Sequence, residues 1–82
     1  MVMYEAGMLA RSKAGHDKAQ MYIIKEVDDT YVYLVDGRIR TLGHPKKKKK
    51  KHVQIIHGIY NMKELDDAGI RKLIKDWMKE EK

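Results

Sequence analysis

The chain has 82 residues, of which 43% are hydrophobic and 37% charged, with one Pro and no Cys. This length fits one small domain, which buries only about 60% of the surface that its unfolded chain exposes, so a deep substrate cavity is not expected. The lack of Cys excludes disulfides and cysteine-ligated zinc. A membrane-spanning helix needs about 20 apolar residues in a row, and a signal peptide needs an apolar core near the N-terminus. The sequence shows neither, and we expect a cytoplasmic protein without membrane contact.

The formal net charge of +6 is concentrated in one segment. Basic and acidic side chains are equal in number over residues 1–45, and again over residues 52–82. The excess is the uninterrupted run of six lysines from Lys46 to Lys51. Adjacent ammonium groups repel one another and destabilise compact structure. We therefore expect this run to form a solvated loop that faces an anionic partner.

The expected elements, in chain order, are five short strands and then one helix. Runs of apolar, β-branched and aromatic residues bounded by turn residues predict strands at Met8–Ser12, Gln20–Val27, Tyr31–Val35, Arg38–Leu42 and His52–His57. The dipeptide Asp36-Gly37 is a two-residue hairpin signal, so the third and fourth of these strands are expected to pair antiparallel. Five strands in about 50 residues are expected to curl into a small barrel or paired sheets.

Helical periodicity appears only near the C-terminus. Five apolar residues follow the i, i+3, i+4, i+7, i+8 pattern and predict a helix over about residues 66–81: Ile70, Leu73, Ile74, Trp77 and Met78. Asp66 or Asp67 is available as its N-cap. A helix of this length is marginal in isolation, so its apolar stripe is expected to pack on the barrel or on another molecule.

A group of residues in the first half of the chain follows a known pattern. It consists of Gly7, the apolar pair Leu9 and Ala10, the turn-like stretch from Ser12 to Lys18, and the apolar strand from Met21 to Ile24. This pattern resembles the KOW motif of ribosomal and transcription-associated RNA-binding proteins. The later segments 34–37 and 46–53 are similar to large-subunit ribosomal proteins of the L-fourteen-e type and their small bacterial relatives. The resemblance covers roughly residues 5–57.

The resemblance implies a mainly β fold, an SH3-like β-barrel over about residues 5–57, in a single domain that ends with the C-terminal helix. It also implies that the loop between the first two strands contacts RNA. By position, Lys13, Gly15, His16 and Lys18 belong to that loop, with Gly15 as its turn residue. Ala19 stands where family members commonly have glycine.

The lysine run suits contact with phosphate backbones. Each neutralised phosphate releases about one counterion, so six contacts predict a log–log salt slope of roughly −4 to −5. Such contacts position a protein on RNA without reading its sequence. Three other interpretations remain: a solvated loop without a ligand, a localisation signal, and an anionic membrane surface. The last has no accompanying acylation motif or basic amphipathic helix.

Two pairs of residues close to the lysines alternate along expected strands. Arg38 and Arg40 share one face, where they either extend the basic surface or pair with nearby carboxylates. Tyr31 and Tyr33 also share a face and could stack unpaired bases. Because the chain has no Phe, we expect these tyrosines to pack in the core instead.

The sequence shows no pattern for metal binding or catalysis. The four histidines lack metal-ligand spacing, and His52, beside the lysines, is assigned to hydrogen bonding with RNA. Ser12 has no G-x-S-x-G setting, and no glycine-rich phosphate loop precedes a helix. We therefore expect no metal, no cofactor, no small-molecule substrate and no enzymatic activity.

The predicted function is non-catalytic binding of RNA, structured or ribosomal, in translation. The predicted RNA-binding residues are Lys13, Gly15, His16, Lys18, Arg38, Arg40, Lys46, Lys47, Lys48, Lys49, Lys50, Lys51 and His52. The alternative is a protein-interaction adaptor whose helical stripe is an exposed docking surface and whose lysines meet an acidic protein. Charge does not distinguish RNA from DNA, and self-association of two copies through the helix stays open.

Overall fold

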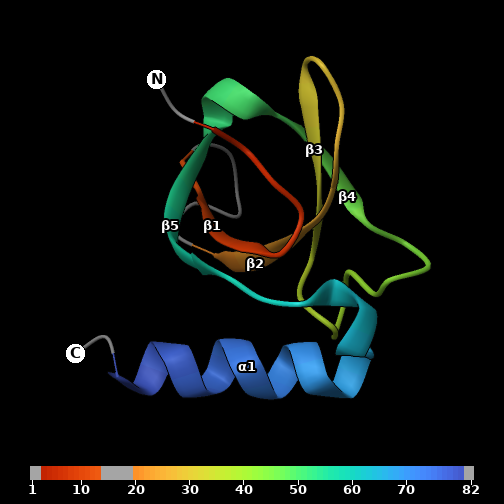
Figure 1. The fold of residues 1–82 in the computed structure, drawn as a ribbon, viewed down its shortest axis with the longest axis vertical. Coiled ribbons are helices and arrows are strands. Elements are labelled where there is room, and N and C mark those ends of the chain that lie inside the picture. The colour runs from red at the N-terminus through yellow and green to blue at the C-terminus, as the bar shows by residue number, and fades with distance from the viewer. Residues whose placement is uncertain (1–2, 14–19, 81–82) are drawn as a thin grey trace.

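The computed structural model describes residues 3–13 and 20–80, which form five strands followed by a helix (Figure 1). The strands are β1 (Met8–Ser12), β2 (Met21–Val27), β3 (Tyr31–Val35), β4 (Lys46–Lys49) and β5 (Val53–Ile59). Two short 3-10 helices, η1 (Lys50–His52) and η2 (Met62–Glu64), precede β5 and the helix α1 (Asp67–Glu80).

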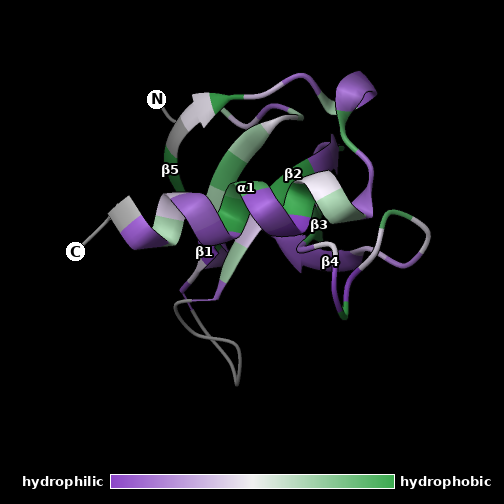
Figure 2. Ribbon diagram, turned by 90° about the horizontal axis from the view of Figure 1, so that it is seen from below, coloured by the Kyte–Doolittle hydropathy of each residue, from purple (hydrophilic) through white to green (hydrophobic). Residues whose placement is uncertain are grey.

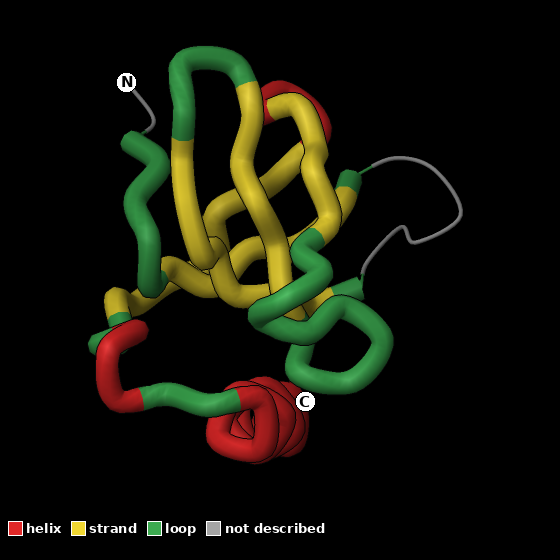
Figure 3. Tube along the Cα trace, turned by 90° about the vertical axis from the view of Figure 1, so that its right-hand side faces the viewer, coloured by secondary structure: helices red, strands yellow, loops and turns green. Residues whose placement is uncertain are grey.

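The strands form one antiparallel sheet in the order β4-β3-β2-β1-β5. The register shifts between Met8 and Ala10 in the β1–β5 pair, and between Ile24 and Glu26 in the β2–β3 pair. Such bulges bend strands, and here the sheet curls into a half-barrel (Figures 1 and 3). This SH3-like, mainly β fold with one C-terminal helix confirms the fold class predicted from the sequence.

The central strands are apolar on both faces because each face has its own cover. One buried cluster fills the barrel: Ala10, Tyr22, Ile24, Val32, Leu34 and Val53. The other lies between the sheet and α1: Leu9, Met21, Ile23, Val35, Ile70 and Ile74. Figure 2 shows α1 lying across the sheet, with apolar strand segments behind it. The continuous apolar run at the start of β2 is therefore buried from two sides.

The helical stripe packs on the chain's own barrel. Ile70 and Ile74 are buried, while the partly buried Leu73 and Trp77 pack against the same cluster. Asp66 is the N-cap, since its Oδ1 accepts a hydrogen bond of 2.7 Å from the backbone N–H of Gly69. Within the described residues, no helix has the length and hydropathy needed to cross a membrane.

The prediction of a strand at Arg38–Leu42 is wrong. The side chain of Asp36, not a hairpin partner, organises this segment: its Oδ1 accepts hydrogen bonds of 2.9 Å from the backbone N–H groups of Arg38 and Arg40. Aspartate often bonds to nearby backbone in this way, and these bonds compete with strand pairing. Residues 36–40 therefore fold into a tight turn.

This turn is also fastened to α1. The guanidinium of Arg71 donates a hydrogen bond of 2.7 Å from Nη1 to the carbonyl oxygen of Gly37. The backbone of Gly37 has a φ of 77°, which glycine adopts without strain. A Cβ at this position would overlap the carbonyl oxygen of Asp67. The glycine thus allows the turn to lie directly against the first turn of the helix.

The prediction that the lysine run forms a loop is also wrong. Lys46–Lys49 form β4, which pairs with β3, and Lys50 and Lys51 continue into η1. Successive side chains of a strand point to opposite faces, which separates neighbouring ammonium groups. The alternate residues Lys46 and Lys48 are half-buried, so their aliphatic stems cover apolar surface. Backbone pairing and this packing offset the charge repulsion that favoured a loop.

Candidate nucleic-acid interface

The six lysines lie in sequence along one side of the sheet, and we call Lys46–Lys51 the lysine edge. β4 is the terminal strand of the sheet and pairs only with β3, so its other side is open (Figure 1). Lysine is a common residue on such strands because it discourages pairing with another chain. Lys47, Lys49 and Lys51 are exposed, and they present their charges to solvent.

Two tyrosines share the outer face of the sheet with the exposed lysines. The register pairs Tyr31 with Lys49 and Tyr33 with Lys47. The Nζ atom of Lys47 lies 4.2 Å from the centroid of the Tyr31 ring, within the range of a cation–π contact. Both tyrosines are half-buried, so the expectation that they pack in the core is wrong. The residues that alternate with them on β3 fill the barrel instead.

Lys50 is held by the surrounding chain and forms the corner between β4 and η1. Its carbonyl oxygen accepts a hydrogen bond of 2.9 Å from the hydroxyl of Tyr4, and its Nζ lies 5.7 Å from the Tyr4 ring centroid. The same Nζ donates a hydrogen bond of 3.1 Å to the carbonyl oxygen of Asp29. Lys50 is therefore partly committed to holding the structure.

An acidic side chain adjoins the lysine edge at the β2–β3 turn. Asp28 accepts hydrogen bonds from the backbone N–H groups of Tyr31 (2.6 Å) and Thr30 (2.9 Å), and from the Tyr33 hydroxyl (2.9 Å). The bond from the Tyr31 backbone is the main cause that lowers the pKa of Asp28, and Lys47 adds to it. The bond to Asp28 raises the pKa of Tyr33. Asp28 is ionised at neutral pH and offsets part of the Lys47 charge.

The far end of the lysine edge meets the start of the loop that was predicted from the sequence to contact RNA. The backbone N–H of Lys13 donates a hydrogen bond of 2.8 Å to the carbonyl oxygen of His52, directly after the last lysine. Three predicted RNA-binding residues, Gly15, His16 and Lys18, lie outside the described residues. The structure thus brings the first residue of the predicted loop to the lysine edge.

The near end of the lysine edge meets the two arginines. Arg38 and Arg40 do not share the face of a strand as predicted, because they lie in the turn that Asp36 organises. They nevertheless line a shallow hollow together with Lys46, the first residue of β4. Segments that are separate in the sequence therefore form one continuous basic border.

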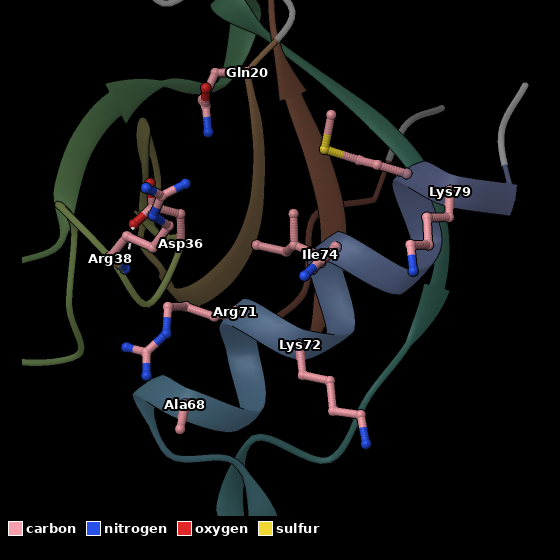
Figure 4. A pocket seen from close by; sticks show the side chains of 10 residues that line it. Gln20, Asp36, Arg38, Ala68, Arg71, Lys72, Ile74 and Lys79 are labelled. Carbon is pink, nitrogen blue, oxygen red and sulfur yellow. Dashed lines mark hydrogen bonds between the residues drawn. The ribbon is translucent and has the colours of Figure 1, made fainter.

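A second basic surface was missed by sequence reasoning. An open groove lies between α1 and the turn at residues 36–40 (Figure 4). Its cationic lining residues are Arg38, Arg71, Lys72, Lys75 and Lys79. The balanced charge of residues 52–82 concealed the four that lie on α1, because a sum over a helix does not show which side carries each charge. The i, i+3, i+7 spacing of the three lysines was the available signal.

Comparisons with protein-family models and with curated proteins give no match for this chain. Among the described side chains, no group of three or more His, Cys, Asp or Glu is arranged to hold a metal ion. The functional argument therefore depends on the basic surfaces and their neighbours.

Proposed function

We propose that the protein binds RNA without catalysing a reaction, and that it holds the phosphate backbone along the lysine edge. The observation that carries this proposal is the meeting of three sequence segments on one border. Arg38 and Arg40 lie at one end of the lysine edge, and Lys13 lies at the other. The KOW-like pattern supports RNA as the polyanion, because Lys13 begins the loop that contacts RNA in that family.

The exposed lysines and the tyrosines supply different parts of the interaction. Lys49 and Lys51 are exposed and reach phosphates as flexible point charges, which bind without sequence preference. The Tyr31 ring offers a face on which an unpaired base stacks. A base that stacks there displaces the Nζ of Lys47, which then turns to a phosphate. This chemistry favours structured RNA that displays unpaired bases, such as ribosomal RNA.

The lysine contribution is tested by filter binding to ribosomal RNA over a salt series. We expect a log–log slope of roughly −3 to −5, since Lys50 is largely held by the chain. Lys49→Gln should make the slope shallower by about 1. Lys63→Gln, which removes the same charge at an exposed site far along the chain, is the matched control and should leave the slope unchanged. Absence of binding, binding indifferent to salt, or equal effects of the two variants would contradict the proposal.

The stacking contribution has its own test. Tyr31→Leu should weaken binding to an RNA hairpin with an unpaired loop by about fivefold, since base–aromatic stacking is worth about 1–3 kcal/mol per base. Binding to a fully paired duplex and the salt slope should not change. An equal loss for the hairpin and the duplex would show that the ring does not stack a base.

The adaptor alternative depended on an exposed helical stripe. Ile70 and Ile74 are 0% and 7% exposed, and Trp77 packs against the same cluster, so the barrel covers the stripe apart from Met78, which is 49% exposed. RNA binding needs no such surface and uses the border that the chain builds. An acidic protein partner for the lysines remains a distinct outcome of the binding assay, because polyglutamate of matched charge would then compete as well as RNA.

A further inference from the structure

We infer that the groove between α1 and residues 36–40 is a second RNA-binding surface, which continues the lysine edge and takes further nucleotides of the same strand. This inference rests on the proposed function, because it extends the same ligand onto α1. It assigns a role to the basic side of α1, since only the apolar side of this helix packs on the barrel.

The groove has two walls from distant parts of the chain. The turn at residues 36–40 provides Arg38, and α1 provides Arg71, Lys72, Lys75 and Lys79. In Figure 4, Arg71 extends from α1 toward the turn, in keeping with its hydrogen bond to the carbonyl oxygen of Gly37. This bond fixes the spacing between the walls, so the groove is built before any ligand arrives.

The helix wall presents its charges in a row. Lys72, Lys75 and Lys79 share one helix face and span about 10 Å along the axis at 1.5 Å per residue. All three are exposed. A row of cations of this length, on the helix that forms one wall of the groove, matches a run of backbone phosphates better than a single small anion.

The groove is positive although it contains one carboxylate. Five of its lining residues are cationic, and Asp36 is the acidic one. Asp36 is 9% exposed, and its Oδ1 accepts two backbone hydrogen bonds, so its charge is directed into the turn. The unbalanced charge attracts a polyanion and raises its local concentration.

The groove is continuous with the lysine edge. The hollow that contains Arg40 and Lys46 also contains Gln20, Asp36 and Arg38, and these last three line the groove as well. A strand that leaves the lysine edge at Lys46 therefore passes Arg38 and enters the groove along this shared lining.

The floor of the groove is apolar, which distinguishes RNA from a simple polyanion. Ile74 lies at the floor, and Met78 is 49% exposed. The polarisable thioether of methionine adapts to irregular apolar partners. Ribose and base faces offer such partners, whereas a bare polyphosphate does not.

The experiment compares two lengths of RNA by fluorescence anisotropy. The probes are an oligouridylate of about 5 nucleotides and one of about 20 nucleotides, near the lower limit and beyond the upper limit of site sizes for single OB-fold domains. The wild-type protein should bind the long probe more tightly. In Lys75→Gln/Lys79→Gln, the affinity for the long probe should fall by at least about fivefold and its salt slope should become shallower by about 2. The short probe should bind as before.

Matched controls separate position from charge. Lys75→Gln alone should weaken binding of the long probe. Lys63→Gln, which removes the same charge outside the groove, should not. Glutamine is a good helix former, and the thermal midpoint of each variant should stay close to that of the wild type. Met78→Ser should weaken binding of the long RNA but leave binding of inorganic polyphosphate unchanged.

The outcomes distinguish this inference from the proposed function. If the wild type binds neither probe, the proposed function fails. A second outcome is that the wild type binds both probes while the double variant alters neither affinity, or alters both equally. In that case the groove does not extend the site, and this inference is overturned while RNA binding stands. If binding of polyglutamate depends on Lys75 and Lys79 as strongly as binding of the long RNA does, the groove is a site for an acidic protein.

Discussion

The carboxylate of Asp67 accepts a hydrogen bond of 2.8 Å from the backbone N–H of Leu42, which lies 25 residues earlier in the chain. Asp67 is in the first turn of α1, where its charge also interacts favourably with the helix dipole. Together with the Arg71 bond to Gly37, this contact fastens the segment that precedes β4 to the helix.

The Asp67 contact predicts a measurable loss of stability on its removal. Asp67→Ala should lower the free energy of unfolding by about 1–3 kcal/mol, because it leaves a part-buried N–H without its charged acceptor. Asp67→Asn keeps an acceptor oxygen and should lose less. Urea denaturation followed by circular dichroism measures both. Equal stability of wild type and Asp67→Ala would show that the segment is held by other contacts.

Two glycines of the same segment give a matched pair of substitutions. Gly37→Ala should destabilise the protein by roughly 2–4 kcal/mol, because alanine is strained at positive φ and its Cβ meets the helix backbone. Gly43→Ala should change stability by less than about 0.5 kcal/mol, since nothing lies within 4 Å of a Cβ there. Similar thermal midpoints for the two variants would contradict this account of the turn.

The lowered pKa of Asp28 predicts a stability change in acid. Its folded-state pKa lies below 3.8, the value of an unperturbed carboxyl. The stabilisation is therefore fully present above 3.8 and is lost as the pH falls through that value toward the folded-state pKa. Asp28→Asn, which keeps an acceptor but has no charge, should remove this part of the pH dependence. Denaturation midpoints measured across this range should converge for wild type and variant at the acid end.

The elements whose own residues follow a local pattern were predicted correctly from the sequence. Alternation and apolar runs gave β1, β2 and β3, and the helical period gave α1, because each pattern reports burial of its own residues. Arg38–Leu42 failed because the Asp36 side chain bonds to the backbone of this segment, and because Asp67 and Arg71, which no local pattern connects to it, hold it against α1.

The lysine strand failed for a related reason. Strand propensity depends on where a strand lies, and lysine is acceptable on an open edge next to β3 although it is poor in a sheet interior. The charge count located the lysine edge, since that needs only composition. It missed the groove, because a sum of charges ignores the side of α1 that carries them, and because the turn that forms the other wall is placed against the helix only by the fold.

The position of Lys46 and Lys48 predicts what protects the lysine edge from self-association. The register pairs them with Leu34 and Val32, so they share the barrel-facing side of the sheet. Lys46→Val/Lys48→Val should keep the strand, because valine favours strands and buries more apolar surface. It should increase association at the open side of β4, since inward-pointing charges on edge strands oppose such pairing. Size-exclusion chromatography with light scattering measures this, and Lys46→Arg/Lys48→Arg, which keeps both charges, is the control. If the valine variant has the same mass as the wild type at high concentration, the lysines are not what keeps β4 from pairing.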